Sequence, residues 1–442
     1  GGAAAAAPSS ASASSKVRKV KLDAASPFDL DAYLARYTGE ARVRRALFVG
    51  THCDELAPRA LRDALDTLVK STSNTVSYKD LYERYGELCG VDLPDTAWSD
   101  ATERRCAKQR EKIDADLAQA KQNIDKVATR RAFLALGDYH YSRGDYSSAM
   151  KAFVKMRDYN KSRAHTLEMC QRVVLVGVAM HNYSLVTTYV SKAEQQSPDA
   201  DEPRTKAQLK VCSALAHLRS KKYRYAARAL LDVSPELGDS FSHVIAPHDV
   251  ALYGVLCALV TFDRAELKKR VIDNVAFKEY AELVPDARAL VADFYGTRYA
   301  AMLATLERLR VRTLLDVHLH EHHTALWAKI RSKALVQYFT PYKSVNLSTM
   351  AAAFSCDADA LEQELASLIA DGDIAARIDS HNKRLIAKPE KQRAQTFERT
   401  LRVGDEYQHQ VKDTLMRVAL LRADVAVKAP RLDKDVFDDR AR

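Results

Sequence analysis

The side chains best suited to chemistry cluster in one short stretch of the sequence, Asp316, His318, His320, Glu321, His322 and His323. Histidine nitrogens and carboxylates are common zinc ligands, so the stretch can be compared with metalloprotease motifs. The motif His-Glu-x-x-His would need a histidine at Thr324. The His-x-His motif of isopeptidase-type metalloproteases would need serine and aspartate at Ala328 and Arg331. We therefore expect no metal site, although His318 and His322 are one helical turn apart and could share an ion. A polar helix face near a subunit junction is the favoured interpretation.

Other catalytic chemistry finds no support in the sequence. Gly-x-Ser-x-Gly, P-loop and dinucleotide-binding glycine motifs do not occur. The seven cysteines are widely spaced and include no Cys-x-x-Cys, which argues against a disulfide framework or a cysteine-rich zinc site and fits a reducing compartment. Carboxylate pairs such as Glu362 and Glu364 are typical of solvated helix faces. The sequence thus predicts a protein without catalytic or cofactor-binding residues.

The composition favours helices. Only 14 Gly and 12 Pro occur in 442 residues, about half the usual share of these helix breakers. The longest apolar run, 250–262, is shorter than the ~20 residues of a membrane-spanning helix, so we do not expect an integral membrane protein. The net charge of +10 permits an acidic protein or nucleic acid as partner and requires neither.

The two ends of the chain read as tails. Residues 1–26 are rich in Ala and Ser, turn basic after position 15, and have nothing to bury, so disorder is expected. This acid-poor composition is also typical of a transit peptide, which stays an alternative. Residues 429–442 are charged and are expected to fray.

A repeat dominates the middle of the sequence. Gly137, Ala149 and Phe153 have the spacing of a tetratricopeptide unit, in which small residues let two antiparallel helices approach closely. The triad Tyr146, Ala149, Phe153 is echoed by Tyr183, Val186, Val190 and by Tyr223, Ala226, Leu230. A mainly α, tetratricopeptide-like solenoid over 27–340 follows from this pattern. Before the repeat, a 4-3 spacing predicts one long helix with an apolar stripe of Ile113, Leu117, Ala120, Ile124 and Val127.

The pattern changes after Pro341. In order, it predicts a strand (345–347), a helix capped by Ser348, a helix started by Asp359 with Glu362 and ended by Gly372, and two strands (374–379 and 384–387) joined by a four-residue turn. This is the layout of a winged helix, which we place at 341–389. Its hairpin is basic, with Arg377, His381, Lys383, Arg384 and Lys388. DNA readout is disfavoured because the second helix is acidic and phosphate would repel it.

A long helix is expected at 390–428. Its apolar residues share a 4-3 register that has no partner in the sequence, which favours bundling with other subunits. The members of this seam are Phe397, Leu401, Val411, Leu415, Val418 and Val425.

A helical-repeat array followed by a winged helix and a terminal helix resembles the PCI-domain family. The matching segments are PFDLDAYLARYTGEARVRRALF (27–48), LLDVSPELGDSFSHVIAPHDVALYGVLCAL (230–259), FDRAELKKRVIDN (262–274), LLDVHLHEHH (314–323) and ARIDSHNKRLIA (376–387), and they are similar to the signalosome members of that family. The resemblance implies a non-catalytic scaffold in the nucleus and cytoplasm. Its partners would be the other subunits of a hetero-oligomer that removes a ubiquitin-like modifier from cullins, and through that complex the cullin–RING ligases.

The same resemblance implies two contact surfaces. The hairpin edge would pair with a neighbouring subunit through Ile374, Ala376, Ile378, Leu385 and Ile386. The terminal helix would enter a shared bundle through Leu401, Val411, Leu415 and Val418. Two alternatives stay open, a paralogous scaffold of the proteasome lid and a nucleic-acid-associated PCI protein.

Overall fold

The computed structural model describes residues 20–21, 28–89, 96–196, 203–388 and 392–425. Apart from Val20 and Lys21, the two predicted tails lie outside the described residues. Helices dominate, and the strands form one small sheet, so the predicted mainly α class is confirmed. None of the described helices is both long and apolar enough to cross a membrane.

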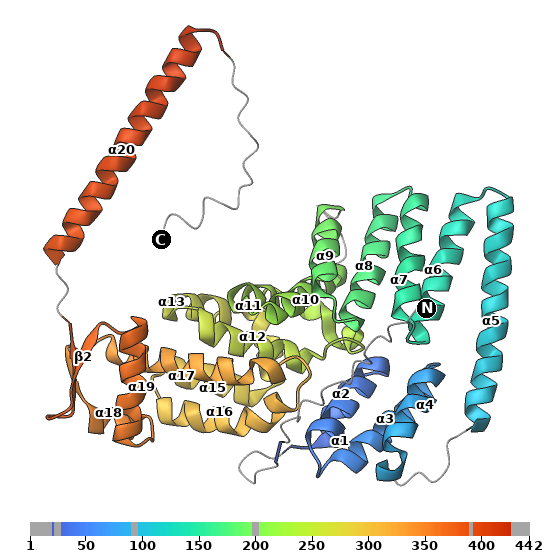
Figure 1. Cartoon of the computed structure of the whole chain (residues 1–442), viewed down its shortest axis with the longest axis horizontal. Helices are drawn as coiled ribbons and strands as arrows, with labels where there is room; N and C mark the ends of the chain where they lie inside the picture. Colours follow the sequence, from blue (N-terminus) through green and yellow to red (C-terminus); the bar gives the residue numbers. More distant parts are fainter. Residues whose placement is uncertain (1–19, 22–27, 90–95, 197–202, 389–391, 426–442) are drawn as a thin grey trace, which may run out of the picture.

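The chain begins with a compact group of four helices. They are α1 (Leu30–Leu34), α2 (Gly39–His52), α3 (Ala57–Ser71) and α4 (Thr75–Cys89). Their shared core includes Leu34, Leu61 and Leu68, and it also contains Ala246 and Leu315 from much later in the sequence. This N-terminal group therefore packs against the middle of the chain (Figure 1).

Antiparallel helix pairs follow. They are α5 (Thr96–Gln122), α6 (Lys126–Ser142), α7 (Tyr146–Lys155), α8 (Arg163–Ala179), α9 (Tyr183–Gln196), α10 (Pro203–Arg219) and α11 (Tyr223–Leu231), with a 3-10 turn η1 (Met156–Tyr159) after α7. Figure 1 shows α5 to α9 standing side by side. The helical repeat of the prediction is confirmed.

The repeated triads mark equivalent positions in this array. The tyrosine of each triad begins a helix, α7, α9 or α11, and the small or branched residue that follows, Ala149, Val186 or Ala226, is fully buried. A methyl group added to Gly137 would collide with the ring of Phe153, so this glycine allows α6 and α7 to pack closely.

One expectation about this region is wrong. The stripe from Ile113 to Val127 does not lie on one helix, because α5 ends at Gln122. Ile124 sits in the turn with a positive φ of 54° and an 83% exposed side chain. The carboxylate of Asp125 accepts hydrogen bonds from the backbone N–H groups of residues 127 and 128, and this N-cap starts α6 as a separate helix.

The second half of the body is built on α12. Its elements are η2 (Pro235–Phe241), α12 (Pro247–Thr261), α13 (Arg264–Leu267), a π turn η3 (Lys268–Ile272), α14 (Val275–Glu282), α15 (Pro285–Tyr295), α16 (Tyr299–Leu314), η4 (His320–His322) and α17 (His323–Phe339). Every residue of α12 from Asp249 to Leu259 is buried, and α12 contacts α11, α14, α15 and α17.

The predicted winged helix follows α17. It contains β1 (Ser344–Asn346), α18 (Leu347–Ala353), α19 (Ala358–Asp371), β2 (Ala376–Asp379) and β3 (Arg384–Ala387). The strands form an antiparallel sheet in the order β1-β3-β2, so β2 is an edge strand. One continuous core runs from the repeats into this domain as far as Leu385.

The helix starts differ from the prediction, although the layout is confirmed. The N-cap of α18 is Asn346, whose side chain accepts a hydrogen bond from the N–H of Ser348. The N-cap of α19 is Asp357, so Asp359 lies within the first turn. Gly372 ends α19 in the left-handed conformation, as its position suggested.

The last described element is α20 (Gln392–Arg422), a helix of 31 residues. It extends away from the winged helix (Figure 1). At 1.5 Å per residue it is about 46 Å long.

Candidate interaction surfaces

The sequence suggested that the histidine-rich stretch forms a polar helix face, but the structure does not place it along one helix. It occupies the connection between α16 and α17, including η4. Oδ1 of Asp316 accepts hydrogen bonds from the backbone N–H groups of His318 and Leu319, at 2.9 and 3.1 Å. Nδ1 of His323 lies 2.9 Å from Oγ1 of Thr313, and Nδ1 of His322 lies 3.3 Å from the hydroxyl of Tyr223. These side chains are therefore engaged within the chain.

The same connection anchors the N-terminal helices. The Arg45 guanidinium donates to Oδ2 of Asp249 at 3.0 Å, and both side chains are at least 97% buried. The hydroxyl of Tyr37 donates to the same oxygen at 2.6 Å. From α12, the hydroxyl of Tyr253 donates to Oδ1 of Asp316 at 2.6 Å, and burial raises the pKa of that carboxyl. The hydroxyl of Tyr33, on α1, donates to Oδ2 of Asp316 at 3.5 Å, so a buried polar network joins α1 and α2 to α12 and to the histidine-rich connection.

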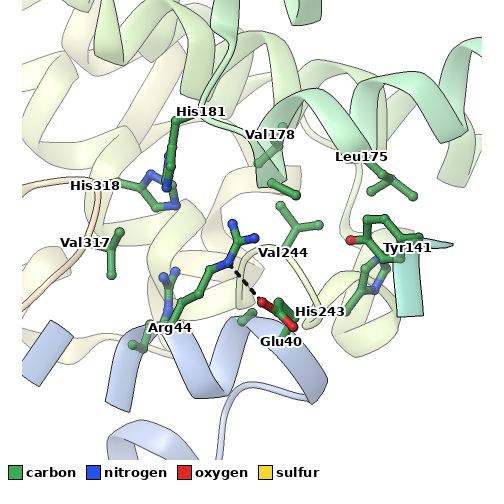
Figure 2. A pocket seen from close by; sticks show the side chains of 13 residues that line it. Glu40, Arg44, Tyr141, Leu175, Val178, His181, His243, Val244, Val317 and His318 are labelled. Carbon is green, nitrogen blue, oxygen red and sulfur yellow. Dashed lines mark ion pairs between the residues drawn. The ribbon is translucent and has the colours of Figure 1, made fainter. Parts of the chain in front are cut away.

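A small cavity of about 40 Å³ lies beside this network (Figure 2). Figure 2 shows Arg44 in an ion pair with Glu40, while His181 and His318 lie close together at one end of the cavity. Burial, followed by the nearby charge of Arg45, lowers the pKa of His318 well below its usual range. Across the described residues, no group of three potential ligands is arranged to hold a metal ion. The cavity has room for little more than water.

The basic hairpin is partly neutralised by the acidic helix beneath it. Nζ of Lys383 lies 3.0 Å from Asp359 and 2.9 Å from Glu362, both on α19. Glu364 pairs with Arg331 of α17 at 2.9 Å. The charges that suggested a nucleic-acid surface therefore serve in part to join the hairpin to the domain.

The five hairpin residues predicted at a subunit contact fall into two groups. Ile374, Ala376 and Leu385 are at least 95% buried in the core of this chain, so their side chains are not available to a partner. Ile378 is half-buried and Ile386 is 43% exposed. The side-chain face of the predicted contact is thus smaller than the alternation suggested.

The backbone of β2 can be considered separately from its side chains, because β2 lies at an edge of the sheet. Lys388 donates to the carbonyl of Ala375, and this bond sets the alternation along the β2–β3 ladder. By that alternation, Arg377 bonds to β3, while the N–H and C=O groups of Ile378 face outward. An outward-facing row of this kind is a template for another strand.

Helix α20 brings together the residues predicted for the bundle. Leu401, Val411, Leu415 and Val418 are 55%, 38%, 64% and 43% exposed. Among the residues of α20 whose side chains are described, all except Leu420 are exposed. The prediction missed Tyr407, which lies one turn before Val411 in the same register, and three further exposed apolar side chains, Val403 and Leu421 beside the seam and Met416 on another face. These side chains form one broad apolar stripe, and an exposed stripe of this kind is typical of a helix that packs against a partner.

Comparison with known proteins places these surfaces in a family. Three family models match, 26S proteasome subunit RPN7 at 95–270, the PCI domain at 304–389, and COP9 signalosome complex subunit 1, C-terminal helix, at 392–419. A COP9 signalosome complex subunit 1 from Arabidopsis thaliana is 43% identical over 92% of this chain and 92% of that relative. The chain belongs to the COP9 signalosome complex subunit 1 family.

The chain is also similar to a second member of the COP9 signalosome complex subunit 1 family and, at lower identity, to a proteasome subunit. Subunit 1b from Drosophila melanogaster is 36% identical over 91% of this chain and 86% of its own length. The 26S proteasome non-ATPase regulatory subunit 6 from Oryza sativa is 25% identical over 81% of this chain and 91% of its own length. The resemblance drawn from the sequence, to subunit one of the signalosome within the PCI-domain family, is confirmed. The family model of its C-terminal helix coincides with α20.

Proposed function

We propose that this chain is a non-catalytic scaffold subunit of a signalosome, the complex that removes a ubiquitin-like modifier from cullins and so regulates cullin–RING ligases. The observation that carries the proposal is the state of α20. Its apolar side chains are exposed on a helix that matches the C-terminal helix of the subunit 1 family. Exposed apolar surface of this extent is typical of protein interaction sites.

The bundle role is tested by reconstitution with the other signalosome subunits. Leu415→Asp places a carboxylate in the predicted seam, where burial in a bundle would be costly. We expect at least a tenfold loss of this chain from the assembled complex in size-exclusion chromatography with mass spectrometry. The matched control, Gln410→Asp, adds the same group on a different face of α20 and should assemble normally. Normal assembly of Leu415→Asp would reject the bundle role.

The sheet edge is tested with Ile378→Pro. The register directs the N–H of Ile378 away from β3, so proline removes no hydrogen bond from the chain's own sheet. A strand added from a neighbouring subunit would lose a partner, and we expect weaker incorporation with an unchanged circular dichroism spectrum. Arg377→Pro, which removes an N–H that bonds to β3, should instead disturb the winged helix itself. Unimpaired incorporation of Ile378→Pro would remove the edge from the proposal.

The non-catalytic role has its own measurement. Asp316, His322 and His323 of the histidine-rich connection form hydrogen bonds within the chain, and the metalloprotease spacings are missing. The purified chain, supplied with zinc and a modified cullin, should release no modifier above the rate without protein. Release by the chain alone would overturn this part of the proposal.

A proteasome-lid scaffold is the second candidate, favoured by the RPN7 model over 95–270. Affinity purification from a native extract separates the two. Recovery of the remaining signalosome subunits and cullins supports the first proposal, and recovery of lid subunits in their place supports the second.

A further inference from the structure

A groove runs along α17. It consists of two adjoining hollows, of about 610 and 680 Å³, that share Lys333 and Val336. The first is walled by the turn at 221–225 and by the end of α19, and the second continues to Tyr342. We call this surface the α17 groove. Hollows of this size are large enough for several residues of a bound chain.

Lysines dominate one wall of the α17 groove. Lys221, Lys222 and Lys329 line it, and in the described part of the chain none of them forms an ion pair. Arg224 also lines the wall, but it lies 3.3 Å from Glu266 and is thus already neutralised. Unpaired cations gathered in a concavity attract carboxylates or phosphates.

Lys333 fixes the floor between the two hollows. Its ammonium group donates to the carbonyl of Leu259, at 2.9 Å, and to that of Phe262, both at the C-terminal end of α12. Burial lowers its pKa to about 8, so it remains mostly charged at neutral pH. The side chain is therefore a positioned positive charge and not a mobile surface lysine.

Tyrosines provide the apolar contacts. Lys329 lies over the ring of buried Tyr223, with Nζ 5.2 Å from the centroid. Tyr225, in the first hollow, and Tyr342, in the second, are 55% and 49% exposed. Exposed tyrosine rings give large contact areas at low cost in conformational entropy, and they are enriched in protein interfaces.

We propose that the α17 groove binds an extended acidic segment of a partner protein. Carboxylates lie over Lys222 and Lys329, and an apolar side chain packs on Tyr342. From Lys329 to the end of α17 the helix rises by about 15 Å, the span of about five residues of extended chain. The proposal goes beyond the scaffold role, which concerns the winged-helix edge and α20.

Two features favour a peptide over a compact polyphosphate. Most of the groove's cations line the first hollow, Lys333 lies between the two hollows and Arg264 lines the second, so the positive charges are spread along the groove, whereas a compact polyphosphate would need them around one point. Asp371 and Asp373, on the α19 wall, would also repel a dense negative charge. A peptide can place its carboxylates at the lysines and its backbone N–H groups toward these two acids.

The test uses the full chain and a phage library of random ten-residue peptides. We expect the selected peptides to be at least threefold enriched in Asp and Glu over the starting library. A fluorescein-labelled consensus peptide should then bind the wild-type chain in anisotropy measurements. Lys222→Glu with Lys329→Glu should weaken binding at least tenfold, and Tyr342→Ala about threefold.

The control reverses the same number of charges elsewhere. Lys151→Glu with Lys155→Glu alters two exposed lysines on α7, a helix that lies far from α17 in Figure 1, and should change the affinity less than twofold. Lys222→Gln with Lys329→Gln is a milder variant that should still weaken binding. Selected peptides without acidic enrichment, or equal losses in both charge-reversal pairs, would overturn the proposal. So would displacement of the peptide by inorganic triphosphate at a lower concentration than by unlabelled peptide, which would assign the groove to phosphates.

Discussion

Helices α12 and α20 are both rich in apolar residues, yet they lie in opposite environments. In α12, all residues from Asp249 to Leu259 are buried by neighbouring helices of the same chain. In α20, large apolar side chains such as Leu415 and Met416 are about two-thirds exposed. An apolar pattern therefore shows that a helix will be covered, but the surrounding chain decides whether the cover comes from the same molecule or from another.

The largest loss of stability is expected when the buried ion pair between α2 and α12 is broken. Arg45→Ala leaves the carboxylate of Asp249 buried without its cation, and we expect a loss of about 3–5 kcal/mol in the free energy of unfolding. Urea denaturation followed by circular dichroism measures it. Arg59→Ala breaks an exposed pair with Asp31, and should cost about 1 kcal/mol or less. Similar losses in both variants would contradict the importance of burial here.

The comparison itself can be tested with one substitution on each helix. Leu256→Ala in α12 removes a fully buried side chain and should cost about 2–5 kcal/mol, since the surrounding helices cannot close the cavity completely. Leu415→Ala in α20 should leave the urea midpoint of the isolated chain unchanged and reduce its recovery in the reconstituted complex. A large loss of stability from Leu415→Ala in the isolated chain would show that α20 is already covered.

Low pH should reduce stability through the buried region around His323 and not through α20. Burial lowers the pKa of His323 to about 4, from 6.5 in the unfolded chain. As the pH falls below 6.5 the unfolded chain binds this proton first, so stability is lost between pH 6.5 and 4, by up to about 3 kcal/mol at the lower end. His323→Asn should flatten this part of the profile in urea midpoints measured from pH 7 to 4. His409→Asn, at an exposed position of α20, should leave the slope as it is.

The smallest effects are expected from two glycines. Gly137→Ala forces a methyl group against Phe153 and should cost about 1–3 kcal/mol. At Gly404, in α20, an added methyl group meets nothing within 4 Å. Gly404→Ala should therefore stabilise the helical state of α20 by about 1 kcal/mol, the difference in helix propensity between glycine and alanine. Thermal scans and far-ultraviolet circular dichroism would show opposite signs for the two variants. The same sign in both would argue that the two helices are packed alike.

Local patterns explain what could be predicted from the sequence. The triads around Ala149, Val186 and Ala226 identify the repeats because close helix packing needs small or compact side chains at fixed offsets. The order of elements in the winged helix was likewise readable, with Gly372 as a stop signal. The break at Ile124 was missed because the apolar spacing runs across it, although Asp125 carried a capping signal.

Long-range packing explains what could not. The Arg45–Asp249 pair joins residues 204 positions apart, and no local pattern announces it. In the hairpin, the alternation of residues identified an apolar face but not what packs against that face. Ile374 and Leu385 belong to the chain's own core, and the surface left for a partner is mainly the backbone edge beside Ile378.

The exposure of α20 also has a consequence for the abundance of this protein in a cell. A copy that has not found its partners displays a long helix with solvent-facing leucines and valines, whereas an assembled copy would hide them. Chaperones and proteases select for that kind of surface. The helix that would secure the chain in a complex would thus also mark every surplus copy, so that the abundance of the chain would follow the abundance of its partners.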